Sequence, residues 1–303
     1  MPNVRANGID IEYESFGRLS DPAILLIMGV TSNLLTWPDS LCQGLAAKGF
    51  RVIRFDNRDV GRSTHLDALG RTDLKALIAE LMAGRPMAAS YRLEDMAADA
   101  VGLLDALGIE RAHVVGASMG GMIGQLVAID HPTRTKSLVS VMSTTGRLEV
   151  SQPKPEAFAV LLTPPASPAR EDRIAQSFAA WRVIGSPGFP ASDEELTAFV
   201  TRRIDYAPYD PDGDSRQLAA VIAAPPRNER LKSVVAPTLV IHGDADPLIP
   251  VSGGEDTAQS IPGAELLVIP GAGHDLSESL VPTYVKAIGD FAAKVDAKEN
   301  ARA

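Results

Sequence analysis

The sequence predicts an α/β protein in which helices cover both faces of a mostly parallel sheet, with one helical insertion. Three observations lead to this fold class. Short continuous apolar runs, typical of strands buried on both faces, alternate with amphipathic helical patterns through residues 1–145. A stretch rich in proline and alanine, residues 146–233, breaks the alternation. The alternation resumes over residues 234–303. We therefore expect a core built from the first and last segments and a helical cap built from residues 146–233.

The expected elements of the first segment follow one another in a regular order. An alternating pattern predicts an exposed strand at residues 9–17, and apolar runs predict buried strands. Helical spacing ends at a glycine, Gly49, in the first helix and before Pro132 in the third. The buried strands are expected within residues 22–30, 51–63, 112–118 and 135–144, and the helices within 41–50, 93–109 and 120–132.

The insertion and the last segment are predicted by the same criteria. Two pieces of the insertion, residues 170–184 and 192–207, keep amphipathic spacing, which favours a helical unit over a disordered linker. Strands are expected at the starts of residues 236–250 and 264–276, followed by a closing helix at 279–295. The tail, residues 296–303, is expected to be frayed.

Composition and charge exclude several classes of protein. Hydrophobic residues make up 45% and charged residues 22% of the 303 residues, which is ordinary for a globular chain. The formal net charge of −9 comes from scattered residues and offers no electrostatic footprint for nucleic acid. A single cysteine, Cys42, excludes an intramolecular disulfide, and its helical position indicates a small core residue.

The apolar runs also bear on location. The longest, AILLIMGV, is far shorter than a membrane span, and the first residues contain no run of signal-peptide length. We therefore expect no membrane span and a cytoplasmic protein. The oligomeric state is left open, a homodimer included.

One short motif points to chemistry. Gly116 to Gly120, GASMG, fits the pattern G-x-S-x-G between an expected strand and an expected helix. A sharp turn there would expose the Ser118 hydroxyl, and the amides at the start of the helix would face developing negative charge. Close packing of helix on sheet also explains these glycines. A dinucleotide fingerprint is disfavoured, because it would require glycine at position 118.

A serine nucleophile needs a base, and a base needs an orienting acid. His274 is the expected base, because it lies in a glycine-rich loop directly after a buried strand, at the sheet edge where α/β folds place their sites. Asp246, in the loop after the preceding strand, is the expected acid, and Asp244 is the alternative, with a role in bracing the loop. Structural roles are favoured for the remaining histidines, His65, His113, His131 and His242.

Two backbone amides are expected to form an oxyanion hole. One is the N–H of Met119, directly after the nucleophile. The other is expected in the loop after an earlier strand, LLIMGVTSNLLTW, with Val30 as the candidate and Met28 or Thr31 as alternatives.

At this point the chain resembles a known family, the α/β-hydrolase fold enzymes. The segments LLIMG, FDNRDVGRS, VVGASMGG, GDADPLIP and PGAGH correspond in order to that family's oxyanion loop, D-x-R-G-x-G-x-S segment, nucleophile elbow, acid loop and histidine loop. The resemblance implies an eight-stranded sheet with a cap domain, and the chain order Ser118, Asp246, His274. Met28 replaces the usual histidine and Asp59 a common glycine. With WP at Trp37, these features look most like a bacterial subgroup that includes polyketide methylesterases such as aclacinomycin methylesterase.

The expected function is hydrolysis of a small-molecule carboxylic ester through an acyl-serine, without metal or organic cofactor. A methylesterase or a lipolytic esterase on hydrophobic substrates is included. On the same fold, a carbon–carbon bond hydrolase, a cofactor-free perhydrolase or haloperoxidase, and an aminopeptidase using Glu194 and Glu195 remain alternatives. A weakly hydrolytic ligand receptor is the alternative from another class. Trp181 in the cap is the candidate for substrate contact.

Overall fold

The computed structural model describes residues 2–85 and 89–301. Its eight-stranded sheet has the order β1-β2-β4-β3-β5-β6-β7-β8. The β1–β2 and β2–β4 pairs are antiparallel and every other pair is parallel, which confirms the predicted fold class. The strands are β1 (Asn3–Ala6), β2 (Ile9–Phe16), β3 (Ala23–Ile27), β4 (Arg51–Phe55), β5 (Ala112–Ala117), β6 (Thr135–Val141), β7 (Thr238–Gly243) and β8 (Glu265–Ile269).

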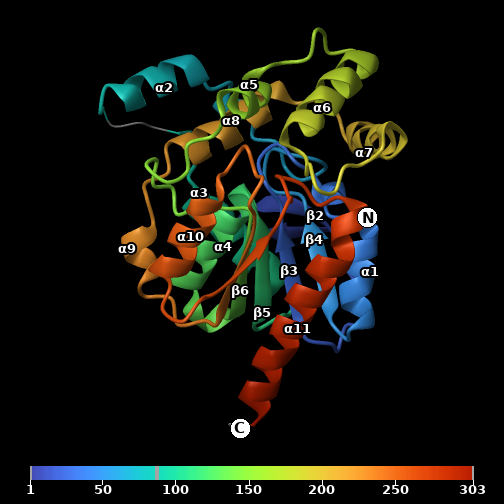
Figure 1. Cartoon of the computed structure of the whole chain (residues 1–303), viewed down its shortest axis with the longest axis vertical. Coiled ribbons are helices and arrows are strands. Elements are labelled where there is room, and N and C mark those ends of the chain that lie inside the picture. Colours follow the sequence, from blue (N-terminus) through green and yellow to red (C-terminus); the bar gives the residue numbers. More distant parts are fainter. Residues whose placement is uncertain (1, 86–88, 302–303) are drawn as a thin grey trace.

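Helices cover both faces of the sheet, and an apolar core lies on each side (Figure 1). One face carries α1 (Asp39–Ala47) and α11 (Val281–Asn300). The other carries α3 (Leu93–Ala106), α4 (Met119–Asp130) and α10 (Val251–Ser260), with the short α9 (Asn228–Leu231) packed against α4 and α10. Cys42 lies in the core under α1, as expected, and burial raises the pKa of its thiol to about 12.

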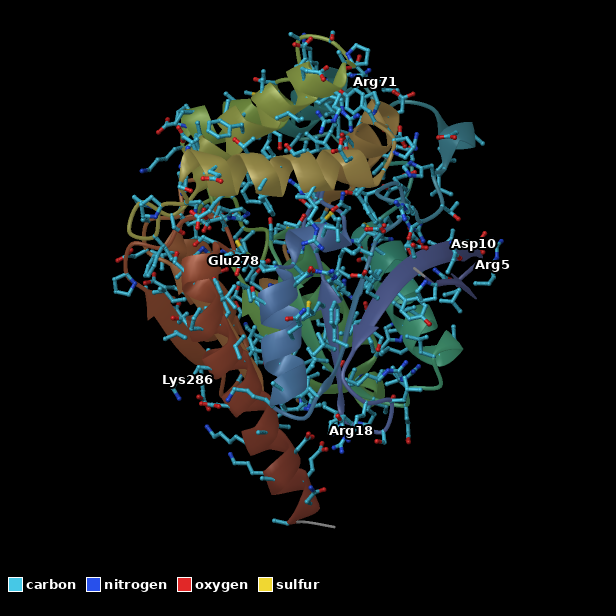
Figure 2. All side chains as sticks on the ribbon, turned by 90° about the vertical axis from the view of Figure 1, so that its right-hand side faces the viewer. Arg5, Asp10, Arg18, Arg71, Glu278 and Lys286 are labelled. Atoms are coloured by element: carbon cyan, nitrogen blue, oxygen red, sulfur yellow. The ribbon has the colours of Figure 1, made fainter. Side chains whose placement is uncertain are left out.

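Between β6 and β7 the described chain contains helices and no strand. We call α5 (Pro155–Leu162), α6 (Arg170–Ile184), α7 (Asp193–Tyr206) and α8 (Pro211–Ile222) the upper helical layer. It lies above the carboxyl ends of the parallel strands in Figure 1, and α2 (Leu74–Met82) packs against α8 beside it. Figure 2 shows the same stacking from the side, with Arg71 at this layer. The boundaries of a cap domain at residues 146 and 233 stay a prediction.

Several elements were not foreseen in the sequence. They are β1, α2, α5, α8, α9, α10 and the short 3-10 helices η1 (Leu34–Thr36), η2 (Asp67–Leu69), η3 (Pro132–Arg134) and η4 (Glu278–Leu280). The expectation of a frayed tail was wrong for residues 296–300, because α11 continues to Asn300, and residues 302–303 lie outside the described residues. Val295 is buried there, Asp296 pairs with His113 at 3.3 Å, and Glu299 pairs with Arg111 at 3.1 Å.

The turn from β5 into α4 depends on glycine for space. A Cβ atom on Gly116 would lie 2.0 Å from the carbonyl oxygen of Gly120. A Cβ atom on Gly120 would lie 2.0 Å from the carbonyl oxygen of Ile27 in β3. Both distances are far below contact distance and both neighbours are backbone atoms. The first turn of α4 therefore sits directly on β3 and β5, at the sheet edge below the upper helical layer.

This packing predicts that two alanine substitutions one turn apart on α4 differ in their effect on the free energy of unfolding. Gly120→Ala should lower the free energy of unfolding by about 1–3 kcal/mol, because backbone must move to admit the methyl group. Gly124→Ala is the matched control, since its Cβ would meet only the side-chain tips of Leu138 and Val114, at 3.2 and 3.3 Å. Urea unfolding measures both. Equal stabilities for the two variants would contradict the proposed close contact.

Candidate active site

Ser118 stands at the strand-to-helix turn in a conformation that serine rarely adopts. Its φ of 55° and ψ of −122° lie in a region that favours glycine. Four hydrogen bonds hold the backbone there. Its N–H donates to the carbonyl oxygen of Val141 at 3.0 Å, and its own carbonyl oxygen accepts from the N–H of Gly121 at 2.9 Å, the N–H of Met122 at 3.3 Å and Ser143 Oγ at 2.8 Å. The neighbours on both sides are buried, whereas Ser118 itself is half-buried. The turn therefore presents the hydroxyl at the carboxyl edge of the sheet.

Asp246 and His274 meet at the same edge. Nδ1 of His274 lies 2.7 Å from Oδ2 of Asp246, and both side chains are buried. The other carboxylate oxygen accepts from the N–H groups of Leu248 and Ile249, at 2.8 and 2.9 Å. These bonds fix the carboxylate and leave Nε2 of His274 without a partner among the described residues. Ser118 and His274 line one cavity.

Asp244, the alternative acid, lies elsewhere in its loop. It accepts a hydrogen bond from the N–H of Gly271 at 2.6 Å and so braces the loop that carries His274. His242 lies at the base of the site, with Nε2 2.8 Å from the carbonyl oxygen of Ile249. Burial lowers the pKa of His242, so this ring is kept neutral beneath Asp246.

The loop of residues 28–33 lies against Ser118. A Cβ atom on Gly29 would be 3.5 Å from Ser118 Oγ. Within the part of the chain that the structure describes, the N–H groups of Val30 and Met119 donate no hydrogen bond. Thr31, one of the alternatives to Val30, donates its N–H to Gln217 at 2.7 Å. Both amides predicted for an oxyanion hole are thus free to donate to a ligand, and their role stays a prediction.

Two residues that hold this loop were missed by the sequence analysis. Gln217 of α8 accepts from Thr31 and donates to the carbonyl oxygen of Arg58 at 2.6 Å. Asn57 donates to the carbonyl oxygen of Met28 at 3.0 Å, close to where the family's histidine is replaced. Asn57 lies in the motif segment FDNRDVGRS, but the motif does not indicate this contact, and no motif marks Gln217.

The cavity has a volume of about 340 Å³, which suits a small molecule. Its floor includes Ser118 and His274, and its upper wall comes from α5, α6, α7 and α8. Trp181 lies in that wall, with its ring 5.2 Å from the ring of Phe199. Glu194 and Glu195, weighed for an aminopeptidase, are instead exposed in the first turn of α7, where Glu195 completes a capping box with Ser192.

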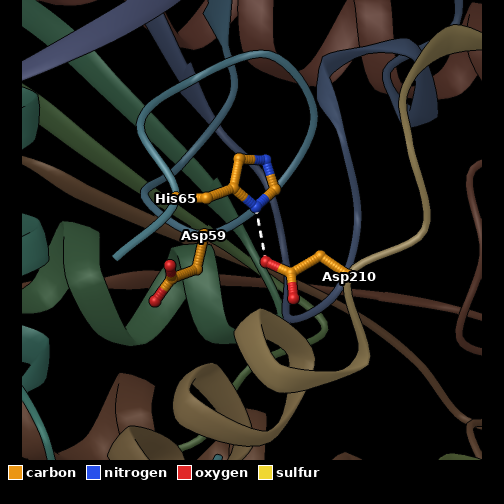
Figure 3. Close-up of side chains that lie close together, drawn as sticks. All are labelled: Asp59, His65 and Asp210. Carbon is orange, nitrogen blue, oxygen red and sulfur yellow. Dashed lines mark hydrogen bonds and ion pairs between the residues drawn. The ribbon is translucent and has the colours of Figure 1, made fainter. Parts of the chain in front are cut away.

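A carboxylate–histidine cluster also lines the cavity, and Figure 3 shows its three side chains. Asp59, His65 and Asp210 form the one group of metal-ligating type found among the described residues. Their oxygens are already occupied. Arg216 binds Asp59 through two bonds of 2.8 Å, and Nδ1 of His65 lies 2.5 Å from Asp210. The guanidinium of Arg216 thus supplies the positive charge that a metal ion would bring. The cluster joins α8 to the loop after β4.

Comparison with known proteins places this chain in a family. A model of the alpha/beta hydrolase fold matches residues 22–279. Rhodomycin D methylesterase DauP of Streptomyces sp. (strain C5) is 31% identical over 286 residues, 87% of this chain and 88% of that protein. The 2-hydroxymuconate semialdehyde hydrolase of Pseudomonas sp. (strain CF600) is 31% identical over 70% of this chain and 73% of its own.

A solved structure agrees with these relatives. The enol-lactonase from Burkholderia xenovorans LB400 superposes with a TM-score of 0.73 at 22% identity, covering 96% of this chain and 100% of that one. This likeness concerns the fold. The chain belongs to the α/β-hydrolase fold family, and the resemblance drawn from its motifs, including the likeness to methylesterases, is confirmed.

The buried ion pair between Asp59 and Arg216 yields a stability prediction. Both side chains are fully buried, so Arg216→Met leaves a carboxylate without its cation and should lower the free energy of unfolding by about 3–5 kcal/mol. Arg202→Met is the control. It removes an exposed ion pair with Asp39 and should cost less than about 1 kcal/mol in the same urea titration.

The double variant Asp59→Gly/Arg216→Met tests the cause. Asp59 has a φ of 65°, which glycine adopts without strain, so removing both charges should recover much of the loss. A double variant as unstable as Arg216→Met would mean that the packing of the arginine, and not the unpaired carboxylate, is responsible.

Proposed function

We propose that this protein is a serine hydrolase of carboxylic esters in which Ser118 is the nucleophile, His274 the base and Asp246 its orienting acid. The 2.7 Å contact between His274 and Asp246, on the cavity that Ser118 also lines, is the observation that carries the proposal. The methylesterase relative supports ester cleavage as the reaction.

In the first half-reaction, Ser118 Oγ bonds to the ester carbonyl carbon while Nε2 of His274 takes the hydroxyl proton. The carbonyl electrons move to its oxygen, which the N–H groups of Val30 and Met119 stabilise. Asp246 holds the Nδ1–H tautomer and stabilises the charged imidazolium. The carbon–oxygen bond to the alcohol then breaks, and the leaving oxygen receives the proton from His274.

In the second half-reaction, water gives a proton to His274 as its oxygen attacks the acyl carbon. The bond to Ser118 Oγ breaks and the serine recovers its proton, which releases the carboxylic acid. The sum is ester plus water to acid plus alcohol. The proposal needs no metal and no organic cofactor, because chain residues perform each proton transfer.

The alternatives use the same cavity and differ in substrate. A carbon–carbon bond hydrolase would turn over dienone acids, a perhydrolase would act on acetate with peroxide, and a receptor would give a single burst of product. The exposed position of Glu194 and Glu195 gives no support to the aminopeptidase alternative. Trp181 is proposed as a substrate contact from its place in the cavity wall.

Location was a separate expectation. Within the described residues, no helix is both long enough and apolar enough to cross a bilayer. The cytoplasmic location expected from the sequence stays a prediction.

Substitution of the proposed triad tests the mechanism. Ser118→Ala should abolish turnover of p-nitrophenyl acetate and labelling by a fluorophosphonate probe. Asp246→Asn should lower kcat about 10³- to 10⁴-fold, because the wrong tautomer of His274 is then favoured. Asp244→Asn is the matched control, since its amide oxygen can still accept from Gly271, and its kcat should stay within tenfold of the parent. Equal losses for the two asparagine variants would refute the assignment of the acid.

Gln217 gives a second prediction, on positioning. Gln217→Leu removes the acceptor that holds Thr31, so the loop that carries Val30 loses its brace to α8. We expect kcat to fall about tenfold with a smaller change in KM, since the amide of Val30 acts on the transition state. Assays well below the melting temperature separate this from unfolding. A change in KM alone would show that Gln217 shapes the cavity and does not position the amide.

A further inference from the structure

The upper wall of the cavity contains an arginine that forms no ion pair with a carboxylate of any described residue, although the charge of Asp214 acts on it. Arg203, on α7, lines the cavity, and its Nε is buried without a hydrogen-bond partner among the described residues. Its Nη2 donates to the hydroxyl of Ser32 at 3.1 Å. The guanidinium lies 5.4 Å from the ring centre of Trp181 and 5.3 Å from that of Phe199. Two aromatic faces and one hydroxyl thus contact this guanidinium.

This arrangement is costly for the protein alone. Burial lowers the pKa of Arg203 to about 10, which still leaves the side chain charged at neutral pH. A guanidinium has five N–H donors in a planar fork that matches a carboxylate. Arg203 is half-buried, and a cation whose Nε is buried without a partner is expected where a ligand supplies the missing anion.

A second guanidinium faces the same space. Arg173, on α6, lines the cavity and lies 4.9 Å from the ring centre of Tyr209. Its side chain makes no hydrogen bond or ion pair with any residue that the structure describes. It differs in this from Arg71 at the rim, which pairs with Asp212 at 3.8 Å. Two arginines of the wall are therefore available to one ligand.

One carboxyl group opposes them. Asp214 of α8 lines the cavity and has no hydrogen bond or ion pair to its side chain among the described residues. Burial raises its pKa to about 7, so near neutral pH a large share of this group carries no charge. The other acids near it are occupied: Asp210 by His65 and Asp59 by Arg216. The unpaired charge of the wall is thus positive on balance.

We propose that Arg203, assisted by Arg173, binds a carboxylate of the substrate, so that the preferred substrates are half-esters of dicarboxylic acids. This inference rests on the ester hydrolysis proposed above and names its substrate class. The 28–33 loop sets the geometry. Gly29 lies against Ser118, and Ser32 and Asn33 bind Arg203, the latter through an Nδ2 bond of 3.0 Å to its carbonyl oxygen. One short loop therefore separates the reacting ester from the bound carboxylate.

A length series of substrates tests this. Monomethyl esters of linear dicarboxylic acids from four to ten carbons are compared with the dimethyl esters of the same acids. The wild-type protein should prefer the half-ester in kcat/KM, with an optimum at one chain length. In Arg203→Met the ratio of half-ester to diester should fall about 10- to 100-fold, as expected for losing a charge-assisted hydrogen-bond pair. Arg173→Met should lower the ratio less.

Two further variants sharpen the test. Asp214→Asn removes the opposing carboxylate and should raise the ratio. Arg202→Met is the matched control, because Arg202 is the neighbour of Arg203 on α7 but is half exposed and pairs with Asp39, so the ratio should stay within twofold. Circular dichroism checks that each variant folds, and Arg203→Lys, which keeps the charge but not the fork, should give an intermediate ratio if Arg203→Met does not fold.

A binding measurement separates this inference from the proposed function. Calorimetry with Ser118→Ala should show half-ester binding that is lost when Arg203→Met is added. Such binding without ester turnover by the wild-type protein would support the anion site and refute the esterase. Turnover with a ratio that Arg203→Met does not change would overturn the inference and leave the esterase standing. A preference for esters that carry an ammonium group would also overturn it, and would assign the site to Asp214.

Discussion

The site depends on how closely the first turn of α4 approaches the sheet. Gly116 and Gly120 have no room for a side chain, and this contact brings the helix onto β3 and β5. The connecting residue, Ser118, then has to accept a φ of 55° to join strand and helix. The backbone strain is maintained by hydrogen bonds on both sides of the turn. The first turn of α4 also lies where Gly29 approaches the hydroxyl of Ser118, so one packing constraint sets the position of the serine and of the loop beside it.

The upper helical layer is joined to this edge by buried polar contacts. Gln217 holds Thr31, Arg216 holds Asp59, and the hydroxyl of Tyr206 donates to Asp56 at 2.9 Å. Burial raises the pKa of Asp56 to about 6 even though the amides of Leu34 and Arg62 also bind it. Polar contacts of this kind are directional, so they fix the position of the layer over the loops more narrowly than apolar packing alone would. The walls of the cavity and the loop next to Ser118 are therefore parts of one network.

The sequence predicted most of the sheet because buried strands and their bounding turns are local patterns, and the helix expected at residues 170–184 coincides with α6. The proposed triad could be named because each residue directly follows a strand, and parallel strands bring their carboxyl ends to one edge. The missed features are of another kind. Gln217, Asn57 and Arg203 act across segments far apart in the chain, and no spacing marks them. The tail was misjudged for the same reason, since the ion pairs that hold it come from Arg111, just before β5, and Lys136 of β6.

Two arginines of the upper helical layer differ in the partners that surround their charges. Arg216 is fully buried, and its guanidinium is paired with the carboxylate of Asp59. Asp59 has a positive φ and stands where the family commonly has glycine. The attraction between the two charges offsets the cost of burying them. Arg203 is of the same residue type and lies in the same layer, yet a hydroxyl and two aromatic rings surround it. Because a half-buried cation without an ion pair lowers stability, a fold that needed only a fixed layer would gain from an apolar residue at this position. The charge of Arg203 is explained if the substrate supplies its anionic partner, as proposed above. The residue that lowers the stability of the free protein would then be the one that selects the substrate.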